Sequence, residues 1–205
     1  QRLGKERRDM KLILKALLPI LILSIALTGC GASADSSSLV LNKKGVITQT
    51  IVEEWDQEQY DKKELQDQIE NQITEYGQKI ELNSIKTKDG KITVKMTYQD
   101  LASYVDYNQV TLFQGTVSQC QASGYLLEGD FKDAKGEPVD RTQVLNIGDK
   151  CVVLVFQEPL SVKIPGKILY CSSSLELVSA KEVKASLEEN SEDFLLPNPV
   201  YVIYK

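Results

Sequence analysis

The sequence predicts an α+β fold: a mostly antiparallel sheet with one main amphipathic helix at 61–76 and one or two short helices, after an N-terminal signal segment. Three observations predict it. Apolar and polar residues alternate on both sides of short turn sequences, as they do in half-buried strands. A single long stretch has helical spacing. The first 29 residues are basic and apolar, whereas the rest of the chain is acidic.

The first elements are a hairpin and the main helix. Apolar runs on either side of Lys43-Lys44-Gly45 predict two strands joined by a turn. Asp61 and Glu64 have the spacing of a capping box, and Gly77 supplies a helix stop. The predicted apolar face of the helix consists of Leu65, Ile69, Ile73 and Tyr76.

A second hairpin and two short helices follow. Asp89-Gly90 is a favoured turn pair between two strands. Short helices are predicted at 100–107 and at 117–123, the latter between Thr116 as N-cap and Gly124 as stop. The buried face of the strand after Asp89-Gly90 is predicted to hold Ile92, Val94, Met96 and Tyr98.

The C-terminal third has the pattern of strands. The run "CVVLVF" at 151–156 predicts a central strand, and Pro165-Gly166 predicts a type II turn. The final strand should place Val200, Val202 and Tyr204 on one face and Tyr201 and Ile203 on the other. "GDFKDAKGEPVD" is the most loop-like segment of the body and the candidate junction of two halves, but no linker is strong enough to divide the body. We therefore expect one domain over 39–205.

Charge and composition exclude several functions. From Cys30 onward there are 18 basic and 27 acidic residues, which argues against a nucleic-acid partner. The chain has no histidine, so it has no Ser-His-Asp or Cys-His site, and a catalytic zinc site is disfavoured. No cofactor, metal ligand or catalytic residue is predicted.

Two groups of carboxylates are candidate metal sites. Glu53, Glu54, Asp56 and Glu58, with Asp61 just after them, lack the spacing of a Ca²⁺-binding EF-hand loop. We expect them to form a solvated strand end and a helix cap. The same argument applies to the second group, Asp133, Glu137 and Asp140.

Cysteine and tyrosine are both predicted to serve the core. Cys120, Cys151 and Cys171 remain once Cys30 is set aside, so at most one disulfide can form within the body. Core packing is the favoured role for all three cysteines; if one bond forms, Cys151 with Cys171 is the expected pair. Several tyrosines lie close together in the sequence, and they could offer an aromatic binding surface. We favour the simpler prediction that Tyr98 and Tyr104 fill the core.

The N-terminal segment carries the clearest functional signal. Lys11 and Lys15 precede an apolar run at 16–27, which is shorter than the roughly 20 residues of a membrane-spanning helix. The run ends at Leu27-Thr28-Gly29-Cys30, which resembles the lipobox of bacterial lipoproteins. The resemblance implies cleavage between Gly29 and Cys30 and a diacylglycerol on the Cys30 thiol. A plain membrane anchor or an uncleaved signal is the alternative.

The residues around this signal complete the expected layout. "MKLILKALL" is a full signal start in itself, so we expect Met10 to be the true initiator and 1–29 to be the signal peptide. Residues 30–38 are then the lipidated cysteine and a flexible tether, whose small polar composition gives an average reach of about 15 Å.

Two stretches of the body, "IVEEWDQEQYDKKELQDQIENQI" and "YVDYNQVTLFQGTV", resemble an uncharacterised group of lipoproteins from Gram-positive bacteria of the clostridial kind. The resemblance implies a location and a continuous fold, but no activity.

Together these features predict a lipid-anchored protein on the outer face of the cell membrane. The expected role is a non-catalytic binding or structural module, with an envelope protein or glycan as partner. A small carboxylate-dependent hydrolase and an accessory ligand-binding protein of a transporter are the alternatives. The transporter role is disfavoured because a two-lobed receptor usually needs a longer chain.

Overall fold

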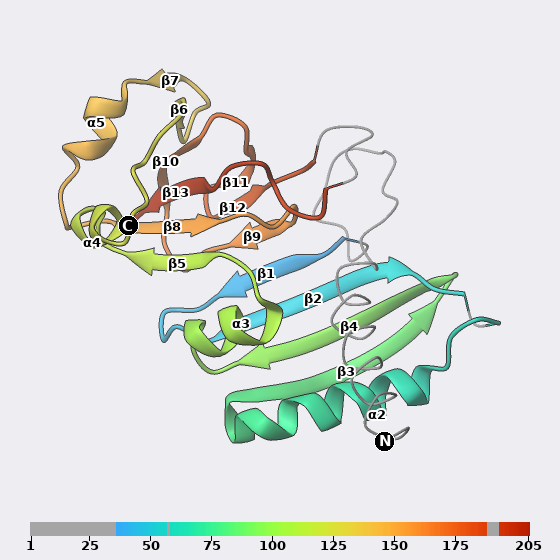
Figure 1. The fold of residues 1–205 in the computed structure, drawn as a ribbon. Helices are drawn as coiled ribbons and strands as arrows, with labels where there is room; N and C mark the ends of the chain where they lie inside the picture. Colours follow the sequence, from blue (N-terminus) through green and yellow to red (C-terminus); the bar gives the residue numbers. More distant parts are fainter. Residues whose placement is uncertain (1–35, 57, 188–192) are drawn as a thin grey trace.

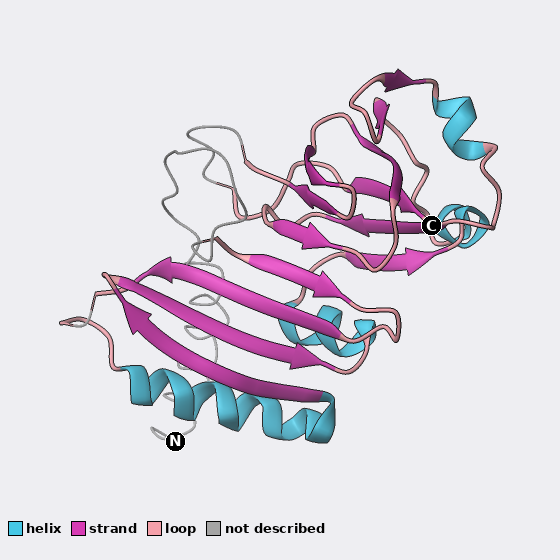
Figure 2. Cartoon of the chain, turned by 180° about the vertical axis from the view of Figure 1, so that it is seen from behind, coloured by secondary structure: helices cyan, strands magenta, loops and turns pink. Residues whose placement is uncertain are grey.

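The computed structural model describes residues 36–56, 58–187 and 193–205. These residues form two mostly antiparallel sheets, one of seven strands and one of six, together with four α-helices and one 3₁₀ helix. Figures 1 and 2 show the longest helix lying along the seven-stranded sheet, beside β3. The predicted α+β class is confirmed.

The seven-stranded sheet has the order β11-β12-β9-β1-β2-β4-β3. Both predicted hairpins lie in it, β1–β2 and β3–β4, and β1 pairs in parallel with β9. The strands are β1 (Ser38–Leu41), β2 (Ile47–Glu54), β3 (Ile80–Lys88), β4 (Lys91–Tyr98), β9 (Ser161–Lys163), β11 (Glu176–Ser179) and β12 (Glu182–Lys184).

The main helix α2 (Lys62–Ile73) is capped by the Asp61 side chain, which accepts from the backbone N–H of Glu64 at 2.8 Å. This is one half of the predicted capping box; the Glu64 side chain instead accepts from Gln68 at 3.2 Å. It is shorter than predicted, because the chain tightens into the 3₁₀ helix η1 (Thr74–Lys79). Gly77 has a φ of 59°, so it is the residue at which helical geometry is lost. Leu65, Ile69 and Ile73 pack into the main core, as the spacing predicts.

The two predicted short helices are confirmed. They are α3 (Leu101–Asn108), capped by Asp100, and α4 (Val117–Ala122), which begins with a capping box between Thr116 and Gln119. Figure 1 places α3 over the seven-stranded sheet and α4 at the end of the other sheet. The helix α5 (Arg141–Leu145), capped by Asp140, was not predicted.

The six-stranded sheet has the order β5-β8-β13-β10-β6-β7. The "CVVLVF" run forms β8, an interior strand of this sheet, as predicted. The segment expected to be a loop is instead a small β6–β7 hairpin. The strands are β5 (Leu112–Gly115), β6 (Phe131–Asp133), β7 (Pro138–Val139), β8 (Val152–Phe156), β10 (Ile168–Ser172) and β13 (Val200–Tyr204).

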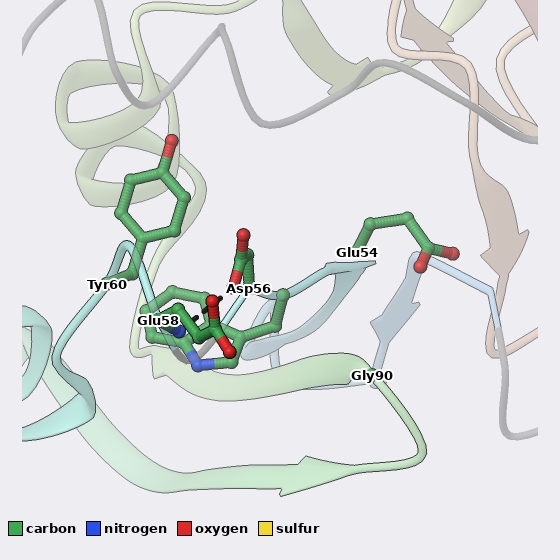
Figure 3. A pocket seen from close by; sticks show the side chains of 6 residues that line it. Glu54, Asp56, Glu58, Tyr60 and Gly90 are labelled. Atoms are coloured by element: carbon green, nitrogen blue, oxygen red, sulfur yellow. Dashed lines mark hydrogen bonds between the residues drawn. The ribbon is translucent and has the colours of Figure 1, made fainter.

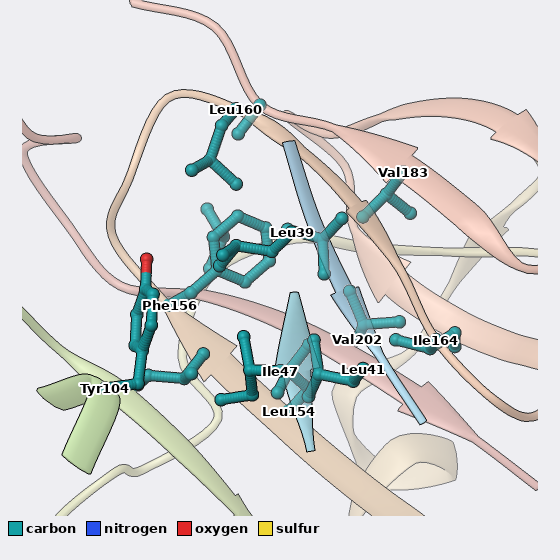
Figure 4. Close-up of a cluster of buried hydrophobic side chains, with 14 of the residues drawn as sticks. Leu39, Leu41, Ile47, Tyr104, Leu154, Phe156, Leu160, Ile164, Val183 and Val202 are labelled. Carbon is teal, nitrogen blue, oxygen red and sulfur yellow. The ribbon is translucent and has the colours of Figure 1, made fainter. Parts of the chain in front are cut away.

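The larger hydrophobic cluster draws on both sheets. Leu39 and Ile47 of the seven-stranded sheet share it with Leu154 and Phe156 of the other (Figure 4). A second cluster lies on the opposite face of the six-stranded sheet and includes Val144 of α5. The last strand, β13, divides its side chains between the two clusters as predicted: Val200, Val202 and Tyr204 belong to the first, and Tyr201 and Ile203 to the second.

The predicted type II turn at Pro165-Gly166 is wrong. Such a turn needs a positive φ at its third position, and Gly166 is not among the residues with positive φ. The glycine serves a close approach instead, because a Cβ there would lie 2.6 Å from the carbonyl oxygen of Lys205. The chain crosses at this point from β9 in one sheet to β10 in the other.

Candidate functional site

The candidate site is a shallow surface pocket where β2 ends. It has a volume of about 590 Å³ and is lined by Glu54, Trp55, Asp56, Glu58, Tyr60 and Gly90 (Figure 3). Two parts of the chain meet here. The backbone N–H of Trp55 donates to the carbonyl oxygen of Gly90 at 2.7 Å, which ties the end of β2 to the β3–β4 turn.

The segment after Trp55 is held by a turn centred on Asp56. The Asp56 carboxylate accepts from the backbone N–H of Glu58 at 2.9 Å, and its carbonyl oxygen accepts from the N–H of Tyr60 at 3.0 Å. An aspartate that bonds the backbone two residues on is a common turn-forming arrangement. The turn brings the ring of Tyr60 back toward Trp55.

The two aromatic rings of the pocket are in contact. Their centroids lie 5.4 Å apart with an interplanar angle of 38°. Trp55 is buried in the main core, whereas Tyr60 is 46% exposed. The tryptophan therefore anchors this end of the sheet, and the tyrosine presents an aromatic surface to solvent.

The pocket is negatively charged. Among the described residues the ion pairs are Lys63–Asp67, Lys79–Asp100 and Lys88–Asp89, and none of them includes Glu54, Asp56 or Glu58. Glu53, next to the pocket, lies on the inner face of β2 opposite Ile92 of β4. Burial, together with the neighbouring Glu54, raises the pKa of Glu53 to about 7.

This combination fits a positively charged ligand. An exposed aromatic face and nearby carboxylates both attract an ammonium group, the first through its π electrons and the second through charge. Among the described residues no group of three or more Asp, Glu or Cys side chains is placed to hold a metal ion. Of the carboxylates expected to form a solvated strand end and a helix cap, Asp61 is the cap of α2. Three others, Glu54, Asp56 and Glu58, line the pocket.

A buried polar network lies deeper, at the junction of the two sheets. The Tyr98 hydroxyl donates to the Gln49 side chain at 2.7 Å, and the Gln49 amide donates to the Tyr104 hydroxyl at 3.4 Å. The Tyr104 hydroxyl in turn lies 2.8 and 2.7 Å from the two oxygens of Glu158. Burial raises the pKa of Glu158 to about 7, even though the hydrogen bond from Tyr104 opposes that rise.

Part of this network was predicted. Tyr98 and Tyr104 are fully buried core residues, as expected. Gln49 and Glu158 were missed. For Gln49 a signal exists, because it stands between Ile47 and Ile51 in the apolar row of β2, where a polar residue needs a buried partner. Nothing around Glu158 in the sequence indicates its burial.

The three body cysteines are free and buried. The expected pairing of Cys151 with Cys171 is not found, because the strands beside these two cysteines are not neighbours in the sheet. The strand β13 separates β8, which follows Cys151, from β10, which holds Cys171. The two residues also belong to different clusters, on opposite faces of the six-stranded sheet.

The other predicted site residues, Gly29 and Cys30, lie outside the described residues. Among the residues that are described, no helix has the length and apolar character needed to cross a membrane. Comparisons with family models, with curated proteins and with solved structures found no match for this chain.

Proposed function

We propose that the protein is a lipid-anchored lipoprotein on the outer face of the cell membrane, and that its body is a non-catalytic binding module. The observation that carries the proposal is the sequence Leu27-Thr28-Gly29-Cys30 at the end of a short apolar run preceded by lysines. No other cysteine of the chain stands in such a context. The three in the body are buried and unsuited to lipid attachment.

The binding role is supported by the pocket at the end of β2. It is shallow, and it combines the exposed ring of Tyr60 with three carboxylates. A surface of this kind binds a ligand without the need for a reactive side chain in the protein. Its charge favours a ligand that carries an ammonium group, such as an amine-bearing envelope component or a basic segment of a neighbouring membrane protein.

The anchoring is tested by the substitution Cys30→Ser in the organism's own cells. Lipid transfer needs the thiol, so we expect the variant to be released into the medium or to accumulate as an unprocessed precursor. Membrane and medium fractions, probed with an antibody against the body, give the measurement. A variant that is cleaved and retained like the wild type would contradict the lipoprotein assignment.

The binding role is tested with tetramethylammonium as a probe and with neutral neopentyl alcohol as its control. Trp55 is the only tryptophan of the chain, so its fluorescence reports the pocket directly. We expect saturable binding of the cation but not of the alcohol. The double variant Asp56→Asn/Glu58→Gln should weaken binding by about 5–30-fold, the equivalent of about 1–2 kcal/mol. Equal responses to the two probes would refute the proposed ligand class.

An activity screen distinguishes the proposed binding module from the alternative of a carboxylate-dependent hydrolase. Peptidoglycan, peptides, esters and glycosides should all remain intact. Turnover that is lost on the substitution Glu53→Gln would favour a carboxylate-dependent hydrolase, because Glu53 is the acid beside the pocket whose pKa lies near neutrality.

A further inference from the structure

The fold begins at Ser37, inside the stretch 30–38 that was predicted to be the tether, so the tether ends before this residue. The Ser37 side chain accepts from the backbone N–H of Val52 at 3.0 Å, and the Ser37 carbonyl oxygen accepts from the N–H of Ser161 at 3.2 Å. The chain therefore joins the body between the end of β2 and the start of β9. Figure 1 shows the start of β1, the end of β2 and the β3–β4 turn on the same side of the seven-stranded sheet.

The tether is too short to let the body move far from its anchor. Six residues separate Cys30 from Ser37. Even a fully extended chain of that length spans at most about 25 Å. The end of the sheet that carries Ser37 is thus held beside the bilayer, provided that Cys30 carries a lipid as proposed above.

Exposed apolar side chains gather at this same end. Among the described residues six large apolar side chains are exposed, and three of them flank the point where the tether joins. Tyr60 lies on the β2 side, in the pocket beside Trp55. The full set is Val40, Tyr60, Leu126, Val178, Phe194 and Leu195.

Phe194 and Leu195 lie on the β9 side. The residue after them, Leu196, donates its backbone N–H to the carbonyl oxygen of Gln157 at 2.8 Å, and its own carbonyl accepts from the Gln157 side chain at 3.3 Å. Gln157 is only four residues before Ser161, whose backbone N–H donates to Ser37. The chain between Gln157 and Ser161 makes a tight turn, in which the N–H of Leu160 donates to the carbonyl oxygen of Glu158.

We infer that this end of the seven-stranded sheet is a membrane-contacting surface, with Tyr60 on one side of the tether and Phe194 and Leu195 on the other. Aromatic side chains with a polar tip favour the interfacial layer of a bilayer, and exposed apolar groups gain by burial there. The carboxylates of the pocket lie at the same end, so attraction to anionic lipids does not drive the contact. The partner is the interfacial layer of a neutral bilayer.

The inference rests on the proposed lipid anchor, so the experiment first measures the anchor. The protein is purified from its native membrane, and the mass of its N-terminal peptide shows whether Cys30 carries a lipid. The lipidated protein is then placed in phosphatidylcholine vesicles that contain a dansylated head-group lipid, and energy transfer from tryptophan to dansyl is recorded.

A matched pair of variants compares the two ends of β2. Trp55→Phe/Tyr60→Trp places the tryptophan at the proposed contact surface. Trp55→Phe/Lys44→Trp places it in the exposed β1–β2 turn at the opposite end, about 25 Å away along the strand. We expect several-fold higher transfer from position 60 than from position 44. Energy transfer from Trp55 in the wild-type protein is measured as a third sample, which needs no substitution.

A second pair tests the apolar side chains themselves. Phe194→Ser/Leu195→Ser should reduce the difference in transfer between positions 60 and 44, because the body then reorients more freely. Leu126→Ser removes another exposed apolar side chain, between α4 and β6, and should leave the difference unchanged. Equal transfer from positions 60 and 44 on a lipidated protein would overturn this inference alone, whereas an unmodified Cys30 would overturn the proposed anchor and the inference with it.

Discussion

The substitution Phe156→Ala should lower the free energy of unfolding by about 3–5 kcal/mol. Phe156 ends β8 in the six-stranded sheet and is fully buried. In the larger cluster it packs with Leu39 of β1 and Tyr104 of α3, both from the side of the seven-stranded sheet (Figure 4). Truncation leaves a cavity between the two layers, so it should weaken both.

The measurement is urea unfolding followed by two signals. Trp55 fluorescence reports the end of the seven-stranded sheet, and far-ultraviolet circular dichroism reports the whole fold. We expect the two transitions to coincide and to shift together in the variant, as in a single cooperative domain over 39–205. A tryptophan transition that stays at its wild-type midpoint would show two independent halves. The surface variant Val178→Ala, on β11, is the control and should change little.

The second large effect concerns Glu158 and pH. Its pKa is about 7 in the folded protein and near 4.5 when the side chain is free in solution. Between these values the folded state binds more protons than the unfolded state. The free energy of unfolding therefore falls as pH rises through this window, by about 2–3 kcal/mol between pH 5 and pH 8.

The variant Glu158→Gln removes this contribution. It should be more stable than the wild type at pH 8, and its stability should depend less on pH between 5 and 7. A weaker slope of the same sign should remain, because Glu53 also has a raised pKa but is more exposed. Urea unfolding at several pH values is the measurement, with exposed Glu81→Gln as control. A wild-type stability that rises between pH 5 and pH 8 would contradict the buried, neutral state of Glu158.

The elements of the fold that could be predicted are those set by local patterns. The alternation in β4 and β13 and the caps at Asp61, Asp100 and Thr116 are properties of a few neighbouring residues, and the structure bears them out. The helix α5 was missed because it is only five residues long and has one buried apolar residue, Val144, so it shows no periodicity.

The arrangement of the strands depends on contacts that local patterns do not encode. The strands β8 and β10 lie close together along the chain, so the sequence suggests that they are neighbours in the sheet. In the structure β13, the last strand, lies between them. This insertion is what separates Cys151 from Cys171. In the same way, Pro165-Gly166 looks like a hairpin turn, while the chain in fact passes from one sheet to the other close to the C-terminal Lys205.

The candidate site was visible only in part. The carboxylates Glu54, Asp56 and Glu58 stand out in the sequence, but their spacing alone describes a solvated turn. The contact of Tyr60 with Trp55 and the bond from Trp55 to Gly90 are what turn the segment into a pocket, and Gly90 lies 35 positions from the tryptophan. That pairing follows from the register of β2 with β4.

The most direct test of the account is the mass of the N-terminal peptide of the protein purified from its own membrane. We predict a peptide that begins at Cys30, lacks residues 1–29 and carries a diacylglycerol on the cysteine sulfur. Lipase treatment should remove the added mass of the acyl chains and leave the peptide sequence unchanged. A peptide that retains residues before Cys30, or one that begins at Cys30 with an unmodified thiol, would contradict the account.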